Sequence, residues 1–76
     1  MTPERRTELR TIARAYAFDV AFGGAPLVGA MTRAWAHSRS RAECRRVLAD
    51  FLTAYRHFAR RAGGATVRLA LKEVHR

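Results

Sequence analysis

The sequence has little cysteine and no long apolar run, and each shortage excludes a class of protein. The single cysteine, Cys44, excludes an internal disulfide, and we expect it to be a core thiol in a reducing compartment. No apolar run approaches the roughly 18 residues that a membrane-spanning helix needs. The N-terminal sequence MTPERRTELR is polar from the start, unlike a signal peptide. We therefore expect a soluble, cytoplasmic protein that has no membrane partner.

Residues suited to catalysis or metal binding are also scarce. His37, His57 and His75 are scattered along the chain, and neither a second cysteine nor a neighbouring histidine joins them. A metal site needs several converging ligands, and a catalytic site needs a nucleophile with a base and an orienting group. The two Gly-Gly pairs lack a phosphate-loop pattern. We therefore expect no enzyme activity, no cofactor and no small-molecule substrate.

Positive charge is what the chain has in excess. Lysine and arginine total 15 against 6 aspartate and glutamate, which gives a formal net charge of +9. Arginine supplies 14 of these bases, lysine and isoleucine occur once each, and asparagine is absent. This usage is typical of GC-rich codons and indicates a high-GC bacterium or its phage. Codon bias explains the choice of arginine over lysine but not the excess of bases, which favours nucleic acid or an acidic protein surface as partner.

Apolar residues recur at helical spacing, which predicts an all-α fold. A chain of 76 residues is expected to form one small domain over residues 1–76, a bundle of three to four short helices. The helices are predicted at about residues 3–22, 26–38 and 41–62, with a short C-terminal helix at 66–74. The last segment also alternates like a strand, so both interpretations of it remain open.

Capping residues set the predicted helix ends. Thr2 can cap the first helix, with Pro3 at its first position, and Gly23-Gly24 can end it. Ser40 and Glu43 match a capping box, in which the serine side chain accepts a backbone N–H and the glutamate reaches back to the chain before the helix. These signals make the third helix the element with the strongest support.

The apolar residues of each predicted helix share one face, and we expect these faces to form the core. The 15 alanines bury little area, so the larger apolar side chains are expected to supply most of it. The three faces are Leu9, Ile12, Ala13, Tyr16 and Val20; Leu27, Val28, Met31, Ala34 and Trp35; and Cys44, Val47, Leu48, Phe51, Leu52, Tyr55, Phe58, Ala59 and Ala62.

Arginines gather on one flank of the first and third helices, and the acids lie on the other. We name the two sets the N-terminal ridge, Arg6, Arg10 and Arg14, and the C-terminal ridge, Arg41, Arg45, Arg46, Arg56 and Arg60. The planar guanidinium suits phosphate and carboxylate. The ridges predict a non-enzymatic protein that binds a nucleic-acid backbone. The alternative is that acids of one helix neutralise the arginines of the next, or that water solvates them.

Phe18 and Phe22 lie about 180–220° around the first helix from its apolar face. Either the segment APLVGAM covers them, or they form a protein interface together with Trp35. The partner could be a second copy of the chain in a homodimer. It could equally be a host protein machine that a small phage or accessory protein modulates or inhibits, as anti-CRISPR proteins and polymerase inhibitors do.

Overall fold

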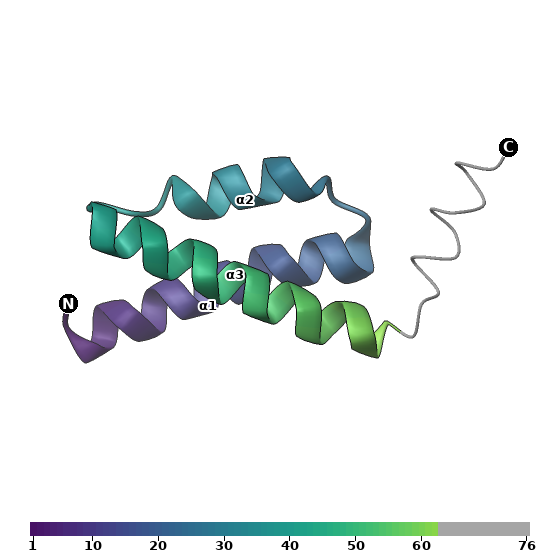
Figure 1. Cartoon of the computed structure of the whole chain (residues 1–76), viewed down its shortest axis with the longest axis horizontal. Helices are drawn as coiled ribbons and strands as arrows, with labels where there is room; N and C mark the ends of the chain where they lie inside the picture. The colour runs from purple at the N-terminus through teal and green to yellow at the C-terminus, as the bar shows by residue number, and fades with distance from the viewer. Residues whose placement is uncertain (63–76) are drawn as a thin grey trace, which may run out of the picture.

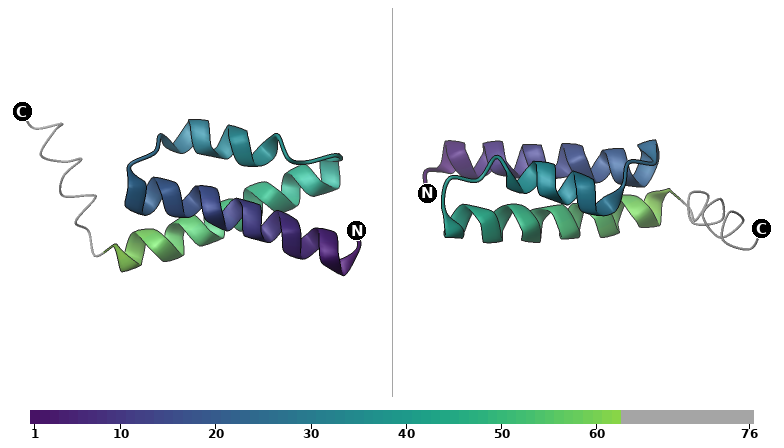
Figure 2. Two further views of the ribbon diagram at one scale, coloured as in Figure 1. Left: turned by 180° about the vertical axis from the view of Figure 1, so that it is seen from behind. Right: turned by 90° about the horizontal axis from the view of Figure 1, so that it is seen from above.

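The computed structural model describes residues 1–62, which are all-helical with no strand in that range (Figure 1). The helices are α1 (Pro3–Gly23), α2 (Leu27–Trp35) and α3 (Arg41–Arg61). Helices α1 and α3 run in the same direction and cross each other, while α2 runs back along one side of the pair (Figure 2). The predicted bundle of short helices is therefore confirmed for this part of the chain. The segment 66–74, for which we predicted a helix or a strand, lies outside it.

The predicted ends of α1 are confirmed. The Thr2 hydroxyl oxygen accepts a hydrogen bond from the Arg5 N–H at 3.2 Å, and Pro3 follows at a position where no donor is needed. At the other end Gly24 adopts φ 73°, which favours glycine, and its N–H donates to the Asp19 carbonyl. The chain can therefore reverse directly after α1.

The start of α3 follows the capping box with one difference. The Ser40 hydroxyl oxygen accepts from the Glu43 N–H at 3.2 Å, as predicted. The Glu43 carboxylate accepts from the N–H of Arg39, at 3.0 Å, and thus reaches one residue further back than the motif requires. The same carboxylate is bound by the Arg5 side chain, which holds it on the α1 side of the cap.

Helix α2 is shorter than the predicted segment 26–38. It begins at Leu27 after Pro26, without a side-chain cap, and ends at Trp35. Beyond Trp35 the chain tightens into a turn, in which the N–H of His37 donates to the Ala34 carbonyl at 3.2 Å and the N–H of Ser38 donates to the Trp35 carbonyl at 2.9 Å. A short helix with a weak start depends on tertiary packing for its stability.

Alanine is the most frequent residue in the core, where it packs beside a few larger side chains. Six of the ten buried apolar residues in residues 1–62 are alanines. Alanine is thus the commonest buried residue by number, and small side chains allow helices to approach closely, while Leu9, Val47 and Phe51 are the largest fully buried side chains among them. The buried residues are Leu9, Ala13, Ala17, Val20, Ala21, Ala30, Ala34, Val47, Phe51 and Ala54.

The apolar face predicted for α2 is only partly buried. Ala34 is buried and Met31 is half-buried, but Val28 remains 75% exposed and Trp35 50% exposed. The reason is that the small residues Ala30 and Ala34 make the close contact with the rest of the bundle. The larger side chains are therefore left at the flank of α2, beside α3.

Phe51→Ala is expected to lower the free energy of unfolding by about 3–5 kcal/mol, because it opens a cavity in the middle of the core. Phe51 is the largest fully buried side chain, at 0% exposure, whereas its neighbour Leu52 is 37% exposed. Leu52→Ala is the matched control and should cost about 1 kcal/mol or less. Urea denaturation followed by circular dichroism measures both. Equal losses in the two variants would contradict this assignment of the core face.

Candidate nucleic-acid interface

The arginines in residues 1–62 divide into a paired set and an unpaired set. Arg5 forms ion pairs with Glu8 and Glu43, each at 2.9 Å, and Arg46 lies 3.5 Å from Asp50. These are the ion pairs within the part of the chain that the structure describes. The alternative, that acids of neighbouring helices neutralise the ridges, is therefore not observed there. Among the ridge arginines in this range, Arg46 alone lies near an acid, which belongs to its own helix.

Arg5 connects three parts of the bundle through its side chain. Its Nε and Nη2 atoms donate to the Glu43 carboxylate, and Nη2 also donates to the His37 carbonyl at 2.7 Å. The Arg5 and Glu43 side chains are only 13% and 14% exposed. One guanidinium thus joins the start of α1 to the start of α3 and to the turn between α2 and α3. Sequence reasoning did not single out Arg5, since nothing local separates it from Arg6.

Hydrogen bonds within this contact shift the pKa of both partners. The bond from Arg5, followed by the bond from the Arg39 N–H, lowers the pKa of Glu43 below its ordinary range. The bond to Glu43 is likewise the main cause that raises the pKa of Arg5. Both side chains therefore carry their charges in the folded protein at neutral pH, and the contact is a charge-assisted pair.

The N-terminal ridge is exposed along α1. Arg6, Arg10 and Arg14 lie four residues apart, and none of them forms an ion pair with another described residue. The guanidinium carbon of Arg14 lies 5.3 Å from the centre of the Phe58 ring, a cation–π contact with α3. Helical geometry places Arg10 and Arg14 about 50–90° from the buried stripe of α1. This ridge therefore borders the contact between α1 and α3.

The C-terminal ridge lies on a different side of the bundle. Arg41, Arg45, Arg56 and Arg60 are exposed and unpaired within residues 1–62. Helical geometry turns them about 110–170° from the buried face of α3, toward solvent. Arg46 differs from them, because its buried Nε lies 3.5 Å from Asp50 Oδ2, a distance too long for a hydrogen bond. Its charge is partly compensated by that carboxylate.

Three aromatic rings meet beside the N-terminal ridge. We name Phe18, Phe22 and Phe58 the phenylalanine cluster; the ring centres of Phe18 and Phe22 lie 4.7 Å apart. Phe58 meets these two rings edge-on, at 5.5 and 5.9 Å. Phe18 stays 50% exposed and Phe22 46% exposed, so the segment 25–31 does not bury them, as one of the two predicted explanations required. Sequence reasoning had assigned Phe58 to the core face and missed this cluster.

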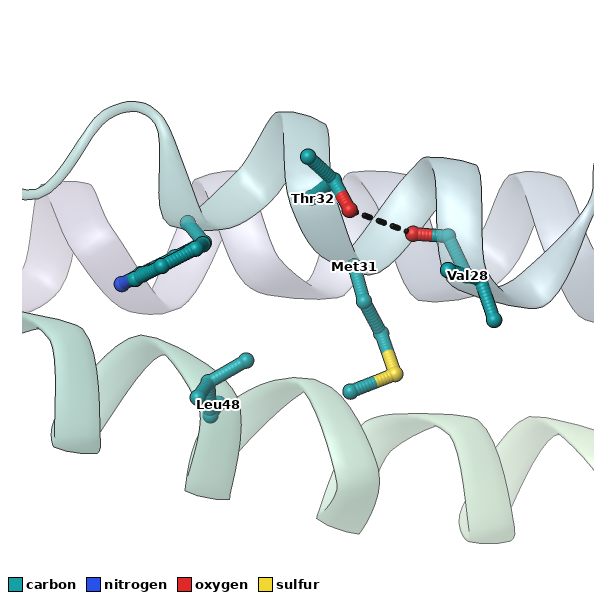
Figure 3. A pocket seen from close by; sticks show the side chains of 5 residues that line it. Val28, Met31, Thr32 and Leu48 are labelled. Carbon is teal, nitrogen blue, oxygen red and sulfur yellow. Dashed lines mark hydrogen bonds between the residues drawn. The ribbon is translucent and has the colours of Figure 1, made fainter.

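A shallow apolar pocket lies between α2 and α3 (Figure 3). Its volume is about 250 Å³, and it is lined by Val28, Met31, Thr32, Trp35 and Leu48. Met31 and Leu48 extend toward each other from the two helices, while the Thr32 hydroxyl donates to the Val28 carbonyl at 2.8 Å. The pocket is therefore apolar, and it is smaller than the roughly 300 Å³ at which small-molecule sites begin.

The other candidate groups do not assemble into a site in residues 1–62. No group of three or more histidine, cysteine, aspartate or glutamate side chains lies close enough there to hold a metal ion. Cys44 is half-buried on α3 and forms no disulfide. None of the three helices described is both long and apolar enough to cross a bilayer. The ridges, the phenylalanine cluster and the pocket are the features that remain to be explained.

Glu43→Gln is expected to lower the melting temperature at neutral pH and to change how the melting temperature depends on pH. Since folding lowers the pKa of Glu43, the stabilisation is present above the ordinary glutamate pKa of about 4.3 and is lost as the pH falls through the lower folded value. The gap in melting temperature between wild type and variant should therefore narrow below about pH 4.3.

Glu4→Gln is the matched control, because Glu4 is exposed in the first turn of α1 and forms no ion pair within the described residues. It should change the melting temperature only slightly, through the helix dipole. A gap for the Glu43 variant that stayed constant from neutral to strongly acidic pH would show that the carboxylate charge is not what stabilises the bundle.

Comparison with known proteins provides no relative from which a role could be transferred. The chain matches no protein-family model, no curated protein sequence and no solved structure. The roles of individual residues therefore have to be argued from the burial, charge and geometry of residues 1–62.

Proposed function

We propose that this protein is a non-enzymatic nucleic-acid binder that holds the phosphate backbone through the arginine ridges. One observation carries the proposal. Of the eight ridge arginines, seven are exposed and form no ion pair with any other described residue; only Arg46 does. The acids of residues 1–62 thus leave most of the excess positive charge free to meet an external anion.

The physical basis is the release of counterions from the phosphate backbone. Each phosphate that a protein neutralises contributes about −0.9 to the slope of log affinity against log salt for duplex DNA, and about −0.7 for single strands. Affinity gained in this way is insensitive to base sequence. A formal charge of +9 also steers the encounter with a polyanion from a distance. We therefore expect binding that is strong at low salt and tolerant of sequence.

Removing charge from the N-terminal ridge is expected to weaken binding more than removing the same charge elsewhere. Arg6→Gln with Arg10→Gln should lower the affinity for nucleic acid and reduce the salt slope by about 1–2. Arg33→Gln with Arg39→Gln removes an equal charge from α2 and the turn that follows it. This control should leave the slope nearly unchanged. Fluorescence anisotropy over a series of salt concentrations measures both.

The same comparison tests the C-terminal ridge with Arg56→Gln and Arg60→Gln, which are exposed and should not disturb folding. An equal loss in all three double variants would show that net charge acts without any defined surface. Absence of binding to DNA and RNA at about 50 mM salt would refute the proposed function, since the electrostatic attraction is strong under that condition.

The apolar pocket supports a second candidate, a protein-directed modulator. Val28 and Trp35 expose large apolar area beside the pocket, and an apolar side chain from a host protein machine could fill it. Val28→Ser, at a side chain that is 75% exposed, should preserve folding. It should abolish capture of one stoichiometric host protein from a nuclease-treated lysate, whereas the Arg6 and Arg10 double variant should retain it. Equal capture by wild type and by the Val28 variant would reject this candidate.

A further inference from the structure

The phenylalanine cluster combines exposed aromatic surface with positive charge. The rings of Phe18 and Phe22 lie 4.7 Å apart with 37° between their planes, so the two half-exposed side chains form one continuous apolar surface. Phe58 supports both rings edge-on from α3 and is itself only partly buried. The cluster is therefore held from two helices while part of it faces solvent.

Arginine adjoins this surface directly. Arg14 precedes Phe18 by one helical turn and lies over the Phe58 ring, at 5.3 Å from its centre, and Arg10 lies one further turn back. The carboxylate nearest in sequence, Asp19, is about 140° around α1 from Arg14, so it lies on the other side of Phe18. An anionic group that approached along the N-terminal ridge would meet Arg10 and Arg14 first and the phenylalanine rings next.

This order of contacts matches one chemical class of ligand, a polymer that carries a phosphate and a flat ring at every repeat. Single-stranded nucleic acid offers both, because its bases are free to leave their stack and lie on a protein side chain. The bases of a duplex stay inside the helix, where an aromatic side chain on a protein surface cannot reach their faces. Stacking on phenylalanine is also tolerant of sequence, since every base presents a π-face.

We propose that the Phe18–Phe22 surface is a stacking platform for the bases of single-stranded DNA or RNA, with Arg10 and Arg14 holding the adjoining phosphates. This inference rests on the proposed function and adds to it a preference for single strands. Phosphate binding alone would give no such preference, since a duplex carries a denser line of charge than a single strand. The aromatic surface supplies the attraction that only unpaired bases can use.

Phe18→Leu with Phe22→Leu tests the platform, since leucine keeps the apolar contact with Phe58 but has no π-face. Wild type should bind a single strand of about 16 nucleotides more tightly than a duplex of the same length. The double variant should lose about tenfold or more of its affinity for the single strand, because each stacked base contributes strongly. Its affinity for the duplex should stay the same, and circular dichroism should show an unchanged fold.

The single tryptophan provides a control within the same titration. Trp35 is the last residue of α2, at the end of the bundle opposite the C-terminal ends of α1 and α3 where the cluster lies (Figure 1). Its fluorescence should therefore stay nearly constant while the single strand binds. A large change of Trp35 emission that Phe18→Leu with Phe22→Leu does not remove would place the strand at the α2 pocket and overturn the inference.

The remaining outcomes separate this inference from the function on which it depends. Equal affinity for single strands and duplexes, with no effect of the two leucine substitutions, would refute the platform and leave backbone binding intact. Loss of all nucleic-acid binding in wild type would refute both. A wild-type dimer in sedimentation that the leucine variant converts to monomer, with affinity for the single strand unchanged, would show that the cluster joins two copies of the chain and would also refute the platform.

Discussion

Small residues at the contacts between the helices determine how closely the three helices pack. Alanine occupies six of the ten buried apolar positions, so the three helices can approach closely around a few larger side chains such as Phe51 and Leu9. A core of this kind buries little area for each residue that it orders. Val28 and Trp35 remain at the surface because Ala30 and Ala34 are the buried residues of α2, and Phe18 and Phe22 because they lie on the side of α1 away from its buried stripe.

Arg5 adds a polar contact between helices to this small apolar core. It joins the starts of α1 and α3 and the preceding turn through one guanidinium, which binds Glu43 at 2.9 Å and the His37 carbonyl at 2.7 Å. Charge-assisted bonds of this kind are stronger than neutral ones. Removing the Arg5 side chain would leave the largely buried Glu43 carboxylate with the Arg39 N–H as its one remaining donor within residues 1–62. The paired acids contact Arg5 and Arg46, so the exposed ridge arginines have no ion-pair partner within residues 1–62, although Arg14 lies over the Phe58 ring. Arg5 and Arg46, which have acidic neighbours, are thus distinct from the seven exposed ridge arginines, which have none within ion-pair distance in the described part of the chain.

Local sequence signals predicted the helices, whereas the buried side of α2 and the ion pairs of the arginines depend on tertiary packing. Thr2, Ser40 and Gly24 act through their own nearest backbone groups, so their effects could be read from the sequence. The buried side of α2 could not be assigned in this way. Its alanine side and its side with larger residues are both apolar, and the contacts with the neighbouring helices determine which of them is buried. Phe58 packs against the core, as its place on the apolar face of α3 predicted, but its contact with Phe18 and Phe22 depends on how α1 lies beside α3. The ridge positions were predictable as exposed, but the pairing of Arg5 and Arg46 depends on where other acids lie in space.

The excess of arginine has two physical consequences, which act on different parts of the surface. It attracts polyanions, and it makes copies of the chain repel one another over a Debye length of about 8 Å at physiological salt. The repulsion opposes self-association through exposed apolar residues such as Val28 with Trp35, or Phe18 with Phe22. A nucleic acid bound as we propose would neutralise the ridges and weaken that repulsion while it covered the phenylalanine cluster. The α2 surface would then be the apolar area still open to a protein, so the two candidate functions place no conflicting demands on the same residues.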